Sequence, residues 1–167
     1  YEGRVFLYLG SASGLSASSF WTAEGNQENA FFGYSVSTAG DVNGDGYSDV
    51  IVGAYAYDNG ETDEGRAYLY LGSVSGLSAS PFWTAEGNQE NAGFGYSVST
   101  AGDVNGDGYS DVLIGAVSYS NGELYEGRAF LYLGSPSGLS TSPSWIAESN
   151  QIYANFGNSV STAGDVN

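Results

Sequence analysis

Oxygen-bearing side chains occupy alternate positions of a nine-residue segment, Asp41-Val-Asn-Gly-Asp-Gly-Tyr-Ser-Asp49, which recurs as residues 103–111. They stand at positions 1, 3, 5 and 9, and Gly46 at position 6 permits a sharp turn. A hard cation such as Ca²⁺ takes six to eight oxygen ligands at about 2.3–2.6 Å. The pattern therefore predicts a Ca²⁺ site in each copy, with the main-chain carbonyl of Tyr47 at position 7 and Asp49 completing the ligand set.

Two other interpretations of this acidic segment compete with the cation site. An EF-hand requires a glutamate at position 12 and a helix after the loop, but position 12 is Val52, and the apolar residues 50–54 are typical of a strand. The other alternative is a solvated acidic turn, because Asn-Gly and Asp-Gly favour turns for backbone reasons alone. Turn chemistry does not require an oxygen-bearing side chain at every second position in both complete copies, which favours the cation.

The acidic segment lies within a longer repeat that has a period of 62 residues. Gly33, Gly95 and Gly157 hold equivalent positions, and residues 31–92 and 93–154 differ at only 16 of 62 positions. All three Trp and all three Arg follow the same period. The chain is therefore built from copies of one structural unit.

Each repeat is predicted to form four short strands, which in the first complete copy span residues 34–39, 49–54, 66–71 and 82–85. The second is a nearly continuous apolar run, which indicates burial on both faces. No segment shows the period of a helix, so almost no helix is expected. Four short antiparallel strands repeated in tandem indicate an all-β protein made of β-propeller blades; a β-solenoid is the alternative, although its repeats are usually shorter.

Composition excludes several functional classes. The 167 residues include 19 acidic side chains against three Arg, and the net charge is −16. The chain has no His and no Cys, which rules out a Ser-His-Asp triad, a thiol nucleophile, the usual zinc sites and disulfides. Three cations cannot neutralise a phosphate backbone, so no nucleic-acid partner is expected, and no apolar run is long enough for membrane insertion or a signal peptide.

The order of three motifs within each repeat matches a known family. Residues 32–36 (Phe-Gly-Tyr-Ser-Val), 40–46 (Gly-Asp-Val-Asn-Gly-Asp-Gly) and 49–54 (Asp-Val-Ile-Val-Gly-Ala) together resemble the FG-GAP repeat of the integrin α-type β-propeller family. Residues 94–116 match it again, and Phe156-Gly157 opens a third copy. One difference is that Tyr55 and Val117 stand where the family often has proline.

The resemblance implies a calcium ion in the hairpin between the first and second strands of each blade. The implied ligands of the two complete loops are Asp41, Asn43, Asp45, Tyr47 and Asp49, and Asp103, Asn105, Asp107, Tyr109 and Asp111. Of a third loop the sequence contains only Asp165 and Asn167. That loop lacks its last carboxylates, so we expect it to be empty or weak unless another chain completes it.

The resemblance also implies an extracellular protein, secreted or on the cell surface, with a structural or adhesive role and no enzyme activity. In the family, the connections between strands two and three and between strand four and the next blade recognise a protein or glycan ligand, on the face opposite the metal loops. Eight of the 16 differing positions lie in or beside these connections: 55, 56, 58, 62, 63, 87, 90 and 91. They suit a variable recognition rim, although unconstrained drift explains them equally well. A carbohydrate-binding lectin is the alternative function.

Three further sets of residues allow a structural or a functional role. Trp21, Trp83 and Trp145 are expected to pack between blades rather than stack on sugars, and Arg4, Arg66 and Arg128 to form ion pairs with nearby acids. The connections that contain Tyr57, Asp58, Asn59, Glu61, Tyr119, Asn121, Glu123 and Tyr125 suit a carbohydrate, a cationic partner or plain solvation. Paired carboxylates for glycoside hydrolysis are disfavoured, because the clustered acids belong to the cation loops.

The repeat period also predicts the organisation of the chain. Residues 1–30 are expected to form the outer half of a blade, 31–92 and 93–154 two complete blades, and 155–167 the first strand of a further blade. A closed propeller typically has four to eight blades. We therefore expect further copies or further blades to complete the ring, since exposed sheet edges and apolar faces would otherwise remain.

Overall fold

A computed structural model describes residues 2–164, and within that range it contains β-strands and no helix. The first four strands are β1 (Arg4–Leu7), β2 (Gly10–Ser11), β3 (Gly14–Leu15) and β4 (Trp21–Glu24). They are followed by β5 (Ser35–Gly40), β6 (Asp49–Ala54), β7 (Arg66–Tyr70) and β8 (Trp83–Glu86). The last four are β9 (Phe94–Gly102), β10 (Asp111–Ala116), β11 (Arg128–Tyr132) and β12 (Trp145–Glu148).

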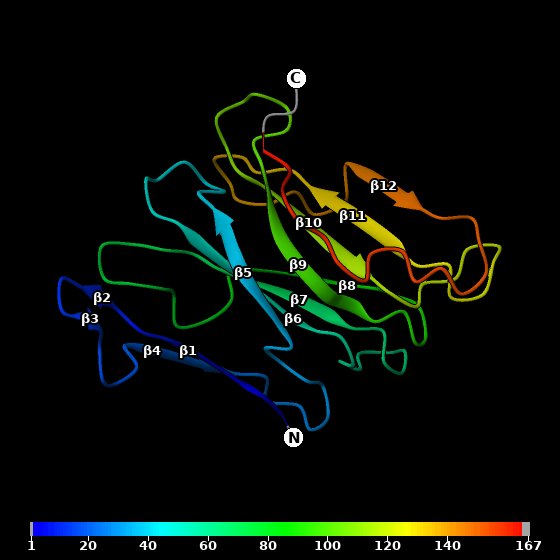
Figure 1. The fold of residues 1–167 in the computed structure, drawn as a ribbon, viewed down its shortest axis with the longest axis horizontal. Helices are drawn as coiled ribbons and strands as arrows, with labels where there is room; N and C mark the ends of the chain where they lie inside the picture. Colours follow the sequence, from blue (N-terminus) through cyan, green and yellow to red (C-terminus); the bar gives the residue numbers. More distant parts are fainter. Residues whose placement is uncertain (1, 165–167) are drawn as a thin grey trace.

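The strands form sheets that follow one another like the blades of an open propeller (Figure 1). Strands β5-β6-β7-β8 and β9-β10-β11-β12 make two four-stranded antiparallel sheets, while β1 pairs only with β4. The all-β class and the four-stranded antiparallel unit are confirmed. The second predicted strand agrees with β6 at both ends, and the others differ by a residue or so at their ends, where strand pairing fades.

Two features outside the complete sheets depart from the repeat, although β1 and β4 pair as β7 and β8 do. A small hairpin of β2 and β3 lies between β1 and β4, and the sequence pattern did not predict it. Residues 155–164 make an isolated bridge, Gly127↔Phe156, rather than a strand. A first strand of this repeat pairs with a second one, and the described residues contain no second strand beside this segment.

Apolar side chains fill the spaces between neighbouring sheets. Strand β6 contributes to both spaces, because Ile51 packs toward β9–β12 in one cluster and Val52 toward β1 in another, and both are fully buried. Burial of this strand on both faces, predicted from its continuous apolar run, is therefore confirmed. The core thus lies between blades, so each blade depends on its neighbour for most of its apolar burial.

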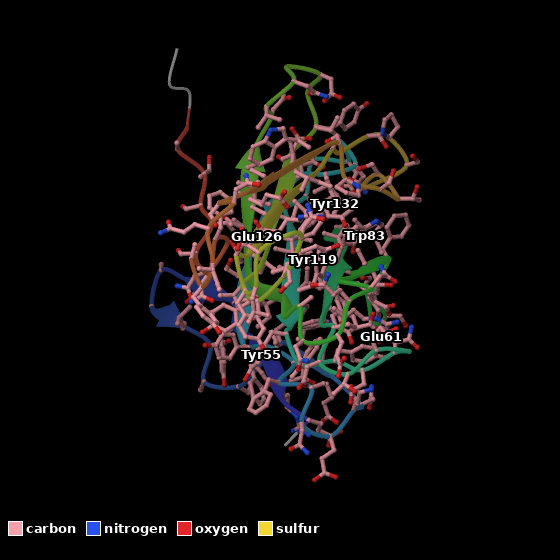
Figure 2. The ribbon with its side chains drawn as sticks, turned by 90° about the vertical axis from the view of Figure 1, so that its right-hand side faces the viewer. Tyr55, Glu61, Trp83, Tyr119, Glu126 and Tyr132 are labelled. Atoms are coloured by element: carbon pink, nitrogen blue, oxygen red, sulfur yellow. The ribbon has the colours of Figure 1, made fainter. Side chains whose placement is uncertain are left out.

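Two of the three tryptophans join one blade to the next, as predicted. Trp83 lies edge-on to Tyr132 with ring centroids 5.0 Å apart (Figure 2), and its indole N–H donates to the Ser140 carbonyl at 3.1 Å. Trp21 does the same one repeat earlier, with Tyr70 and Ser78. Both indole N–H groups are thus used inside the protein.

The arginines form ion pairs with glutamates on the neighbouring strand. Arg66 pairs with Glu86, and its guanidinium lies 4.1 Å from the centroid of the Tyr57 ring. Arg128 repeats the arrangement with Glu148 and Tyr119, and Arg4 pairs with Glu24. The predicted ion pairs are confirmed. Each partner glutamate lies directly opposite its arginine on the adjacent strand, and not next to it in the sequence.

Alanine in place of Arg66 is expected to cost about 1–2 kcal/mol of stability, because it removes a half-buried ion pair and a cation–π contact. Arg4→Ala removes the equivalent pair where both side chains are much more exposed, at 53% and 38% against 21% and 16%. Its cost should stay below about 0.5 kcal/mol. Urea unfolding of both variants tests this, and equal losses would contradict the role given to burial.

Candidate functional site

The two acidic loops each connect the first two strands of a complete sheet. Residues 41–48 join β5 to β6 and residues 103–110 join β9 to β10, so both loops belong to hairpins. Strands flank the loops on both sides, which confirms the exclusion of an EF-hand. Each loop begins where its ladder shifts register, between Thr38 and Gly40 in the first sheet.

Inside the first loop the side-chain oxygens turn inward onto main-chain N–H groups. Asp41 Oδ1 accepts from Gly44 at 2.7 Å and from Asp45 at 3.1 Å, and Asp41 Oδ2 accepts from Gly46 at 2.8 Å. Asp45 Oδ1 accepts from Tyr47 at 2.9 Å. Gly44 and Gly46 make this winding possible at φ values of 75° and 88°, where other residues are strained.

The second loop repeats this geometry almost unchanged. Asp103 Oδ1 accepts from Gly106 at 2.8 Å and from Asp107 at 3.1 Å, and Asp103 Oδ2 accepts from Gly108 at 2.8 Å. Asp107 Oδ1 accepts from Tyr109 at 3.0 Å. Identical sequences therefore adopt the same loop even though their surroundings differ.

The last carboxylate of each loop is buried. Asp49 is fully inaccessible, and its oxygens accept main-chain N–H groups from Val42 at 2.9 Å and Gly72 at 2.8 Å. Burial raises the pKa of Asp49 above its usual range, although the two N–H groups oppose this and the charges of Asp45 and Asp41 add to it. Asp111 is equivalent, with Val104 and Gly134 as donors, and its pKa is raised in the same way.

The loop oxygens match a hard cation in their chemistry. The donors are three carboxylates, a carboxamide and a main-chain carbonyl, all of which are oxygen ligands of the kind Ca²⁺ prefers. In this conformation, no three Asp, Glu, His or Cys side chains within residues 2–164 lie close enough together to hold a metal ion. A carboxylate has about four lone-pair positions, so bonds to loop N–H groups leave acceptor capacity for a cation. Asp165 and Asn167 lie outside the described residues.

The opposite edge of the sheets is formed by the other two connections. Residues 55–65 and 87–93 are tied together there, because Asn91 donates its main-chain N–H to the Thr62 carbonyl at 2.8 Å. The buried Glu64 carboxylate also bridges them, accepting from Asn59 at 2.8 Å and from Asn88 at 3.1 Å. The expectation that these connections share one side is therefore confirmed. The role of Glu64 in joining them was not predicted from the sequence pattern.

Aromatic side chains gather on this same side, between the two complete blades. Tyr34 lies 4.7 Å from Tyr55 and 4.9 Å from Tyr96 between ring centroids, and its hydroxyl donates to that of Tyr96 at 2.9 Å. That hydrogen bond raises the pKa of Tyr34. A cavity of about 430 Å³ adjoins the cluster, with Asp63 and Tyr125 in its wall. The sequence did not predict this cluster, because its residues come from strands and connections that are far apart in the chain.

Strained backbone surrounds the same cavity. Phe31 and Tyr125 line it with φ values of 56° and 51°, which bulky residues adopt rarely, while Asp63 at 50° is of a residue type that tolerates this conformation. Such strain is often concentrated at functional sites. Both connections singled out from sequence reach this cavity, the first through Asp63 and the second through Tyr125, whereas Tyr57 and Tyr119 within them stack on arginines.

Comparison with known proteins agrees with the repeat structure. The sequence model of the FG-GAP repeat family matches residues 32–70 and 94–132. Integrin alpha-PS2 of Drosophila melanogaster is 39% identical over 137 residues, covering 77% of this chain and 10% of the relative. Integrin alpha-5 of Xenopus laevis is 32% identical over 153 residues, covering 88% and 14%, and integrin alpha-3 of Cricetulus griseus is 32% identical over 172 residues, covering 99% and 16%.

The chain thus spans between a tenth and a sixth of the length of these relatives. Within residues 2–164 there is no helix long and apolar enough to cross a membrane.

Proposed function

Because the chain belongs to the FG-GAP repeat family that includes the integrin α chains, we propose that it is a calcium-binding propeller segment of an extracellular adhesion scaffold. It acts by presenting a rigid surface, without enzyme activity, in a secreted or cell-surface protein. Further blades complete the ring, since β1 has no strand on its edge opposite β4 among residues 2–164.

One observation supports the calcium role above the others. Each complete blade buries an aspartate, Asp49 or Asp111, at the end of an acidic loop, whereas the arginines pair with glutamates elsewhere in the described residues. A divalent cation in the loop would offset the repulsion among these acids and the cost of burying the last one. The strand ends on both sides of the loop would then be held together.

The proposed ligands are those of the sequence pattern. They are Asp41, Asn43, Asp45, the carbonyl of Tyr47 and Asp49 in the first loop, and Asp103, Asn105, Asp107, the carbonyl of Tyr109 and Asp111 in the second. When bound, the ion supplies positive charge at the hairpin. The chain's own N–H groups from Val42 and Gly72 meanwhile keep Asp49 in place.

The proposed partner is a protein, bound on the side opposite the metal loops. The aromatic cluster, its adjoining cavity and the strained backbone around it lie there, and the repeats differ from each other at Phe31 and Tyr55 within it. A lectin function finds no support, because Trp21 and Trp83 use their indole N–H groups inside the protein.

The proposal predicts that calcium stabilises the chain. Extracellular calcium modules bind at about 10⁻⁴–10⁻³ M, so 10 mM calcium should add about 1.4–2.7 kcal/mol for each occupied loop. With both loops occupied, the combined stabilisation corresponds, for a chain of this size, to a rise in melting temperature of roughly 5–20 °C. Scanning calorimetry with calcium and with chelator measures the shift, and Asp45→Ala combined with Asp107→Ala should remove most of it.

The matched control removes the same number of charges from the other side of the blades. Glu61 and Glu123 are exposed, occupy equivalent positions in the two repeats, and lie outside the acidic loops (Figure 2 labels Glu61). Glu61→Ala combined with Glu123→Ala should keep the full calcium response. The proposal would be refuted if calcium did not change the wild-type melting temperature. It would also be refuted if both double variants lost the same part of the calcium-induced shift.

A further inference from the structure

The two acidic loops contact each other through hydrogen bonds between Ser110 and the main chain of Asp41. Ser110, at position 8 of the second loop, donates its N–H to the carbonyl of Asp41 at 2.9 Å. In return, the N–H of Asp41 donates to Ser110 Oγ at 3.2 Å. The residue that begins the first loop is therefore held from both of its main-chain polar groups by the second loop.

A second set of hydrogen bonds links the last carboxylates of the two loops. Val42 donates its N–H to Asp49 Oδ2 at 2.9 Å and accepts the Ser135 N–H at 3.0 Å on its carbonyl. The neighbouring Gly134 donates its N–H to Asp111 Oδ1 at 2.8 Å. Asp49 and Asp111 are thus joined by hydrogen bonds and two short pieces of backbone.

Steric contact leaves little freedom between the loops. A Cβ added to Gly44 would lie 2.6 Å from the ring of Tyr109, and one added to Gly40 would lie 2.3 Å from Ser110 Oγ. Movement of one loop therefore displaces the other. Val42 is fully buried by this contact, whereas Val104, at the same position of the second loop, is 54% exposed.

We infer that the two loops bind cations as a coupled pair, with Ser110 as the positioning residue that links them. The inference rests on the proposed calcium function. A cation that fixes Asp41 also fixes the main-chain groups of Asp41 to which Ser110 is hydrogen-bonded. Ser110 in turn lies in sequence between two proposed ligands of the second loop, Tyr109 and Asp111. The first ion bound therefore orders part of the second site in advance, and the effect is reciprocal by linkage.

Ser48 provides an internal comparison. It stands at position 8 of the first loop, equivalent to Ser110, and is exposed. The part of the chain that the structure describes places no other acidic loop against it. Ser48→Ala and Ser110→Ala therefore remove the same hydroxyl from the same loop position, and only the second removal breaks a contact between loops.

The test is calorimetric titration of the full chain with calcium chloride. In the wild type the second ion should bind about fivefold more tightly than the first, or better, which is the usual lower range of coupling between sites. Asp45→Ala and Asp107→Ala leave one loop each, and both variants should show a single site of weaker affinity. Ser110→Ala should reduce the coupling factor by about twofold or more, while Ser48→Ala should leave it unchanged.

Each outcome separates this inference from the function on which it rests. Absence of calcium heat in every protein would refute the calcium function itself. A wild-type isotherm equal to the sum of the two single-loop isotherms would leave that function standing and overturn the coupling. Cooperative binding that Ser110→Ala does not weaken, in a variant whose circular dichroism matches the wild type, would overturn the role of Ser110.

Discussion

Alanine in place of Gly53 is expected to lower the free energy of unfolding by about 3 kcal/mol or more. A Cβ at this position would lie 1.9 Å from the Gly95 carbonyl oxygen, which belongs to the next blade. The backbone fixes the position of the Cβ and the carbonyl is part of the backbone, so no rotamer change relieves the clash, and the two sheets must move apart. The same movement would break the hydrogen bond from Ser35 Oγ to the Gly95 carbonyl, which measures 2.7 Å.

Gly10→Ala is the matched control for this substitution. Apart from its neighbours in the chain, no atom of the described residues lies within 4 Å of a Cβ built there, and its φ is not positive, so the change should stay within about 0.5 kcal/mol of the wild type. Gly115→Ala should behave like Gly53→Ala, because its Cβ would meet the Gly157 carbonyl at 1.9 Å. The denaturant midpoints of the three variants measure these losses of stability. A Gly53→Ala midpoint equal to that of Gly10→Ala would show that the blades tolerate the extra atom.

The glycines at 53 and 95 also show which features a local sequence pattern can predict. The pattern identified the Gly-Ala end of one motif and the Phe-Gly start of the next, both of which are local features. That one packs on the other depends on how the sheets stack, which no local pattern contains. Ser110 against Asp41 was missed for the same reason, because these residues are 69 positions apart and meet only when the blades are side by side.

Features that depend on neighbours within one strand or turn were predictable. The apolar run of β6 predicted burial on both faces, and the alternate oxygens with glycines predicted where the acidic hairpin lies. The details of the loop were less accessible. Asp49 was expected to complete a cation shell, yet its main-chain partners include Gly72, which arrives from the connection after β7.

Phe94→Ala is expected to be the most damaging single truncation in the core, at about 3–5 kcal/mol. Phe94 is fully buried, with ring centroids 5.3 Å from Phe130 and 6.4 Å from Tyr132. It packs in the cluster that also contains Ile51 and Leu69 from the preceding blade. The cavity left behind would therefore open between blades, where neither sheet can collapse without the other.

The control for this truncation is Phe82→Ala, since Phe82 is 54% exposed and should lose about 1 kcal/mol or less. Urea unfolding followed by tryptophan fluorescence measures both variants. Because stability is typically about 5–15 kcal/mol in total, the expected loss at Phe94 is a large fraction of it. A loss no greater than that of Phe82→Ala would mean that the blades do not share this core. The mechanical link assumed between the two acidic loops would then lack its support, because loops on independently moving blades cannot order each other.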